Sequence, residues 1–262
     1  MKKSIVIFLC LSLFFLSSWA EAQITSGTKI SFPLNSSQNL TGNLTKPESN
    51  GPFPAVILLH GCGGGQYNIS NWEDILVKEG YVTFAVDSLG PRGISSNCSS
   101  PQEKPTFMDR VSDAFAARHY LETLPLIDKE RIAVMGFSHG GVTALIMALY
   151  PSAEKPFKEI IAFYPYCFPI DLSNKTLTSP LMILIGDKDD WCPSKLCKAY
   201  PEILKGLNNE IVLKVYPGAH HAFDKTVPGL TSYAGHTMGR DERALADSIV
   251  MVKNYLRKYL KE

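Results

Sequence analysis

Six short, almost continuous apolar runs constrain the fold of this chain more than any other feature. They contain four or five residues each and alternate with segments of helical periodicity. Runs of this kind are typical of parallel strands that are buried on both faces. They occupy residues 55–59, 82–86, 132–135, 160–163, 181–185 and 211–215. Strands that alternate with helices predict an α/β fold, a doubly wound and mostly parallel sheet with helices on both faces.

The remaining segments complete this expectation. Residues 28–34 and 40–44 alternate apolar and polar side chains, which predicts antiparallel strands with one face in solvent. We expect helices over residues 72–79, 107–124, 140–150, 194–207 and 240–259. No linker interrupts the pattern, so residues 23–262 are expected to form a single domain.

The first 22 residues read as a secretory signal peptide. Met1-Lys2-Lys3 is followed by an apolar stretch over residues 4–16 and by the Ala-x-Ala sequence that ends at Ala22. The alternative is an uncleaved anchor, but the stretch is shorter than the about 20 residues that span a bilayer. We therefore expect cleavage after Ala22, no membrane anchor afterwards, and export to the periplasm or the medium.

Export would place five cysteines in an oxidising compartment. We expect Cys62 and Cys98 to form a disulfide bond, because both loops would flank the crevice described below. Three cysteines remain, Cys167, Cys192 and Cys197, so one of them must stay unpaired or form a bond to another molecule. The sequence contains no Cys-x-x-Cys pair, which argues against a zinc site. The formal net charge of +1, without a basic run, argues against nucleic-acid binding.

Polar clusters follow several of the predicted strands at the point where each strand ends. His60 and the glycine-rich residues 61–65 follow the first parallel run, and Ser138 follows the third. Asp187, Asp189 and Asp190 follow the fifth run, and the pair at 220–221 follows the last. In open α/β sheets the functional crevice lies outside the carboxyl ends of the parallel strands. We therefore expect these clusters to share one crevice.

Ser138 is the candidate nucleophile. It is the centre of Gly136-Phe137-Ser138-His139-Gly140, between a predicted strand and a predicted helix. A serine on such a tight turn has its hydroxyl exposed, and the flanking glycines make room for the strained backbone. This pattern indicates a nucleophile elbow rather than a structural turn serine.

A serine hydroxyl needs a base, and a histidine base is best oriented by a carboxylate. Ser138, an aspartate near 189 and a histidine near 220 occur in the chain order that α/β-hydrolases use. Only one of His220 and His221 can point at Ser138. The pattern alone does not choose between them, nor among the three aspartates.

Acyl transfer also needs donors for a developing oxyanion. One candidate is the backbone N–H of His139, because it follows the nucleophile at a helix N-terminus. The glycines after residue 59 permit close backbone approach, which points to the N–H of Cys62 as the second donor. The alternatives for these glycines are a flexible loop and a phosphate-binding loop, but the lysine and the hydroxyl residue expected of a phosphate-binding loop are missing.

Five segments resemble motifs of the dienelactone hydrolase family, which has the α/β-hydrolase fold. They are residues 58–64, 87–93, 136–141, 186–193 and 216–223, and the similarity extends from about residue 52 to the C-terminus. In that family the acid stands three residues after the strand-end glycine and four before a proline. The catalytic histidine stands two before a phenylalanine. The resemblance therefore implies Asp189 and His221 as the acid and the base.

One departure from the family affects the predicted activity. The enzymes that gave the family its name use a cysteine nucleophile, whereas this chain has Ser138. We therefore expect a carboxylesterase that cleaves a small-molecule ester through an acyl-enzyme, without metal or cofactor. The alternatives are an exported peptidase of the prolyl-oligopeptidase type and a non-catalytic binding protein. Aromatic residues would either line an apolar acyl pocket or belong to the core; they are Tyr67, Phe137, Tyr166 and Trp191.

Overall fold

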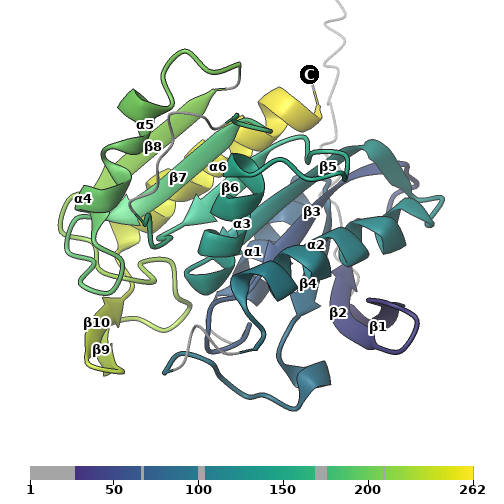
Figure 1. The fold of residues 1–262 in the computed structure, drawn as a ribbon, viewed down its shortest axis with the longest axis horizontal. Coiled ribbons are helices and arrows are strands. Elements are labelled where there is room, and N and C mark those ends of the chain that lie inside the picture. The colour runs from purple at the N-terminus through teal and green to yellow at the C-terminus, as the bar shows by residue number, and fades with distance from the viewer. Residues whose placement is uncertain (1–26, 66–67, 100–103, 169–175, 209, 262) are drawn as a thin grey trace, which may run out of the picture.

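A computed structural model describes residues 27–65, 68–99, 104–168, 176–208 and 210–261. Its centre is an eight-stranded sheet with the strand order β1-β2-β4-β3-β5-β6-β7-β8 (Figure 1). The strands are β1 (Thr28–Pro33), β2 (Asn39–Thr45), β3 (Phe53–Leu59), β4 (Val82–Asp87), β5 (Ile127–Phe137), β6 (Ile160–Phe163), β7 (Leu181–Gly186) and β8 (Ile211–Tyr216). The six apolar runs form the six parallel strands, and β1 and β2 are antiparallel. The predicted fold class is confirmed.

Helices cover both faces of the sheet. Helices α2 (Phe107–Glu122) and α3 (His139–Leu149) lie in front of it in Figure 1. Helices α1 (Ile69–Lys78) and α6 (Glu242–Leu260) cover the opposite face, where Glu79 at the end of α1 pairs with Lys253 of α6. Every residue of β3, β6 and β7 is buried, as expected of strands that are covered on both sides.

One expectation about the C-terminal half is wrong. The single helix predicted over residues 194–207 is two short helices, α4 (Ser194–Cys197) and α5 (Tyr200–Ile203). Pro201 has no N–H to donate within a continuous helix, so it stands in the first turn of α5 instead. The segment after residue 223 also contains an unpredicted hairpin of β9 (Leu230–Tyr233) and β10 (His236–Gly239).

The strand order fixes where a crevice can form. After β3, the chain passes to β4 on one side and then returns to β5 on the other. The loops that follow β3 and β5 therefore diverge at the carboxyl ends of these strands. This is the topological switch point at which α/β sheets bind ligands.

The predicted signal peptide, residues 1–22, lies outside the described residues. Within the described part of the chain, no helix is long and apolar enough to cross a membrane.

Candidate active site

Ser138 stands on a sharp turn between β5 and α3. Its backbone has φ 53° and ψ −113°, a conformation with positive φ that residues other than glycine rarely adopt. The turn is held by the Ser138 N–H, which donates to the Phe163 carbonyl at 2.9 Å. A Cβ at Gly136 would lie 2.1 Å from the Gly140 carbonyl, and one at Gly140 would lie 2.1 Å from the Leu59 carbonyl. Both glycines are therefore required by close backbone packing, as the sequence pattern predicts.

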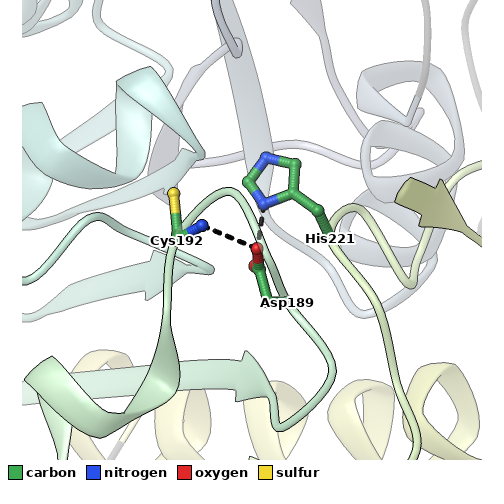
Figure 2. Close-up of side chains that lie close together, drawn as sticks. All are labelled: Asp189, Cys192 and His221. Atoms are coloured by element: carbon green, nitrogen blue, oxygen red, sulfur yellow. Dashed lines mark hydrogen bonds and ion pairs between the residues drawn. The ribbon is translucent and has the colours of Figure 1, made fainter. Parts of the chain in front are cut away.

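His221 and Asp189 complete a hydrogen-bonded chain with Ser138. The Ser138 hydroxyl donates to His221 Nε2 at 2.9 Å, and His221 Nδ1–H donates to Asp189 Oδ2 at 2.8 Å. Asp189 and His221 are buried. Asp189 follows β7, and its other carboxylate oxygen accepts the N–H group of Trp191 and that of Cys192, the second of which is drawn in Figure 2. These bonds fix the carboxylate in the orientation that meets the imidazole.

The neighbouring candidates face other partners. Asp187 accepts the backbone N–H of Gly218, and Asp190 accepts that of Thr237. His220 Nδ1 is buried without a hydrogen-bond partner among the described residues. The geometry thus joins Ser138 to the aspartate and the histidine that the family resemblance implies.

The two candidate oxyanion donors lie beside Ser138. His139 is the first residue of α3, and a Cβ on Gly61 would lie 3.5 Å from Ser138 Cβ, which brings the loop after β3 against the serine. The expected disulfide between Cys62 and Cys98 is present, with a Cα–Cα distance of 4.8 Å. The carbonyl of Cys62 also accepts the N–H of Asn97 at 3.0 Å. The disulfide bond and this hydrogen bond therefore both hold the loop that carries the Cys62 N–H.

A second disulfide joins Cys167 to Cys197, and Cys192 remains free and buried. Its thiol, the Asp189 carboxylate and the His221 ring have atoms within 4.8 Å of one another, a spacing that a metal ion could bridge (Figure 2). However, both Asp189 oxygens already accept hydrogen bonds. Burial and the Asp189 charge raise the pKa of the Cys192 thiol well above its usual range, whereas a metal requires the thiolate. These residues do not fit a metal site.

Two hollows meet at Ser138, and they share the Cys62–Cys98 disulfide and Trp191 as borders. The smaller has a volume of about 40 Å³ and is bordered by Asn68, Tyr164, His221 and Tyr233. The larger has a volume of about 620 Å³ and is bordered by Phe107, His139, Val142, Ile146, Tyr166 and Phe168.

The aromatic residues considered in the sequence divide between these hollows. Trp191 borders both, Phe137 borders the smaller and Tyr166 the larger. Trp191 also packs on His221, with 5.1 Å between ring centroids. Tyr67 lies outside the described residues.

The model of the dienelactone hydrolase family matches residues 40–260 of this chain. The chain belongs to the dienelactone hydrolase family. A dienelactone is a cyclic ester, so membership makes the protein a hydrolase of ester bonds. The resemblance deduced from the sequence motifs is confirmed.

Known proteins similar to this family member support the assignment. A probable 2-oxo-3-(5-oxofuran-2-ylidene)propanoate lactonase of Bradyrhizobium sp is 29% identical over 196 residues, which cover 69% of this chain and 77% of the relative. The structure of a dienelactone hydrolase-like promiscuous phosphotriesterase from metagenomic libraries has a TM-score of 0.75 and 20% identity, and the match covers 90% and 98% of the two chains. Thermogutta terrifontis esterase 2 with bound propionate has a TM-score of 0.65 and 19% identity, and covers 93% and 97%. The two structures show a shared fold.

Behind the elbow of this dienelactone hydrolase family member lies a buried arginine that the sequence analysis missed. Arg110 of α2 is fully buried; it donates from Nη1 to His139 Nδ1 at 2.8 Å and from Nη2 to the His60 carbonyl at 2.6 Å. Burial lowers the pKa of Arg110 to about 10, so the group is still a cation at neutral pH. Burial and this nearby cation lower the pKa of His60 to about 3, so that ring is neutral.

Behind His221 lies a buried carboxyl that was also missed. Asp224 accepts hydrogen bonds from Asn68 at 2.9 Å, from the Trp72 indole at 2.7 Å and from the Tyr164 hydroxyl at 2.7 Å. Burial raises the pKa of Asp224, and the three donors oppose that shift. Three converging donors are the pattern of an ionised carboxylate, which only accepts. The Tyr164 ring meets the His221 ring edge to face, with centroids 4.7 Å apart.

Proposed function

We propose that the protein is an exported serine carboxylesterase that acts through an acyl-enzyme on Ser138. The observation that carries the proposal is the hydrogen-bonded chain from Ser138 through His221 to Asp189, at 2.9 Å and 2.8 Å. A serine beside a base that is itself oriented by a carboxylate is the arrangement of an activated nucleophile. The small-molecule ester class follows from the family of hydrolases to which the chain belongs.

In the acylation step, the Ser138 oxygen forms a bond to the ester carbonyl carbon while His221 Nε2 takes the hydroxyl proton. The tetrahedral intermediate then expels the alkoxide, and His221 returns the proton to it as the alcohol leaves. Asp189 keeps Nδ1 of His221 protonated and stabilises the imidazolium that forms. In deacylation, water attacks the acyl carbonyl carbon while His221 Nε2 takes a proton from it. The bond to Ser138 then breaks, His221 returns the proton to the Ser138 oxygen, and the acid is released.

The negative charge on the carbonyl oxygen would be held by the N–H groups of Cys62 and His139. Each such donor contributes about 3 kcal/mol to transition-state stabilisation. The donor of His139 is also at the N-terminus of α3, where the helix dipole favours an anion. This mechanism needs neither a metal ion nor an organic cofactor.

Export is supported by the two disulfide bonds, because such bonds persist in oxidising compartments. The signal-like sequence of residues 1–22 points the same way. We propose that the mature enzyme begins at Gln23, forms one domain, and acts in the periplasm or the medium.

The test is hydrolysis of p-nitrophenyl acetate and butyrate by the chain from Gln23. We expect Ser138→Ala to reduce kcat by about 10⁴-fold or more, since a triad member is lost. Ser88→Ala is the matched control: Ser88 is buried at the end of β4, and its hydroxyl has no partner among the described residues. Full activity in a folded Ser138→Ala protein would refute the mechanism.

The acid is tested by comparing three substitutions in one loop. Asp189→Asn should cost on the order of 10³- to 10⁴-fold in kcat, because the amide no longer fixes the histidine tautomer. Asp187→Asn and Asp190→Asn should change kcat little, since those carboxylates bind backbone N–H groups elsewhere. A larger loss in Asp187→Asn would reassign the acid.

A further inference from the structure

We propose that the enzyme orients its substrate with a bulky, uncharged acyl chain in the larger hollow and a small alcohol portion in the smaller one. The preferred substrate class is therefore an ester of an apolar acid with a short alcohol. This inference rests on the proposed function and extends it. Its basis is the unequal distribution of the catalytic groups between the two hollows that meet at Ser138.

The proton path assigns the alcohol side. The leaving alkoxide must lie within hydrogen-bond reach of His221 Nε2, which returns the proton to it. His221 borders the smaller hollow, together with Tyr164 and Tyr233. It is not among the described residues that border the larger hollow. The alkoxy oxygen and the groups attached to it consequently extend into the smaller space of about 40 Å³.

The acyl side follows from the oxyanion. His139 borders the larger hollow, and the next two turns of α3 add Val142 and Ile146 to its wall. The carbonyl oxygen lies at the N–H groups of Cys62 and His139, and the alkoxy group lies at His221. The acyl chain must therefore extend along α3. A volume of about 620 Å³ accommodates a chain or ring there, since ligand sites have volumes of roughly 300–1,000 Å³.

The chemistry of the larger hollow selects an uncharged chain. Its border includes the apolar side chains of Phe107, Val142, Ile146 and Phe168. None of its described border residues carries a carboxylate, an ammonium or a guanidinium group. A charged acyl chain would lose its hydration without gaining a counter-ion, whereas the transfer of methylene groups from water into an apolar hollow is favourable.

Two isomeric esters test the orientation. Methyl octanoate and heptyl acetate have the same composition, but the long chain is on the acyl side in the first and on the alcohol side in the second. We expect kcat/KM for methyl octanoate to exceed that for heptyl acetate at least tenfold, measured by titration of released acid. Equal values, or a preference for heptyl acetate, would overturn the assignment.

Two variants localise the chains. Ile146 is half-buried on the wall of the larger hollow, so Ile146→Trp should lower kcat/KM for methyl octanoate at least tenfold more than it lowers kcat/KM for methyl acetate. Tyr233→Ala opens the smaller hollow and should raise kcat/KM for heptyl acetate only. If Ile146→Trp instead reduces both methyl esters equally, the acyl chain does not occupy the larger hollow.

Hydrolysis of p-nitrophenyl acetate distinguishes a wrong substrate orientation from a wrong proposed function. If this hydrolysis depends on Ser138 while the isomers are turned over equally, only the orientation is wrong. If neither p-nitrophenyl acetate nor any alkyl ester is hydrolysed, the proposed function fails and the orientation fails with it.

Discussion

Two buried polar clusters flank the reacting groups, and they carry opposite charge. On the side of the elbow, the Arg110 cation binds the carbonyl of His60 and the ring of His139. On the side of His221, the Asp224 carboxylate binds three donors, one of which is the Tyr164 hydroxyl. Arg110 and Asp224 are both fully buried.

The signs match the charges that the proposed mechanism develops. Negative charge would form at the N–H groups of Cys62 and His139, and Arg110 spans the two turns that carry these donors. Positive charge would form on His221, and Tyr164 connects that ring to Asp224. A fixed charge in a water-excluded site stabilises a transition state without reorganisation. The difference between the clusters suggests that polar burial here follows the electrostatics of the reaction rather than stability alone.

The largest effect should follow from removing the cation. We expect Arg110→Met to lower kcat by about 100-fold, comparable to the loss of one oxyanion donor, with little change in KM. Arg110→Lys should recover part of the loss, because it restores the charge. Steady-state kinetics with p-nitrophenyl butyrate would measure both.

Arg118 provides the matched control on the same helix. It is also buried, and it donates to Glu122 and to the Pro156 carbonyl, away from Ser138. Arg118→Met should lower the melting temperature as Arg110→Met does and leave kcat unchanged. If the two variants have equal kcat values, Arg110 only supports the fold.

A smaller loss is expected from neutralising the anion. In Asp224→Asn, the amide NH₂ group faces donors such as the Trp72 indole, and the buried negative charge is lost. We expect kcat to fall about tenfold, the equivalent of about 1.4 kcal/mol. The acid limb of the kcat/KM pH profile should move to lower pH, because imidazolium formation is less favoured. Tyr164→Phe keeps the ring against His221, so its kcat should fall less than that of Asp224→Asn. A greater loss of kcat in Tyr164→Phe would contradict a role for the charge.

Sequence patterns predicted the sheet and the elbow at Ser138, and the family resemblance implied Asp189 and His221, but neither signal predicted the two charged clusters. Buried parallel strands leave a clear apolar record, and the elbow at Ser138 has a rigid spacing. Arg110, by contrast, is a charged residue on a helix, a pattern typical of a solvent-facing position. It binds His60 and His139, which are 50 and 29 residues away in the chain, and no local pattern records such contacts. Asp224 likewise meets its partners across more than 50 residues of chain.

The smallest effect on activity is expected at another buried carboxyl, Glu159, for which the described residues supply no hydrogen-bond donor. Glu159 precedes β6 at the amino end of the sheet, and neither carboxylate oxygen has a partner among the described residues. Burial raises the pKa of Glu159 well above its usual range. The folded state therefore keeps a proton that the unfolded state releases above about pH 4.5, and stability falls as pH rises from there to the folded pKa.

Glu159→Gln should remove this loss, which amounts to about 1.4 kcal/mol per pH unit within that window. Urea unfolding at pH 5 and pH 8 would measure it, with kcat unchanged because the site lies at the opposite end of the sheet. A parallel decline of stability in variant and parent would show that Glu159 is ionised in the folded protein. In that case the three hydrogen-bond donors of Asp224 would not be what distinguishes its ionisation state from that of Glu159.

The proposed mechanism requires a covalent bond between the acyl group and Ser138. This bond can be detected by mixing the chain from Gln23 with p-nitrophenyl octanoate, quenching in acid within the first turnovers, and mapping the peptides by mass spectrometry. We expect an octanoyl group on the peptide that contains Ser138, and none in Ser138→Ala. An octanoyl group on another residue that persists in Ser138→Ala, with turnover intact, would contradict the mechanism.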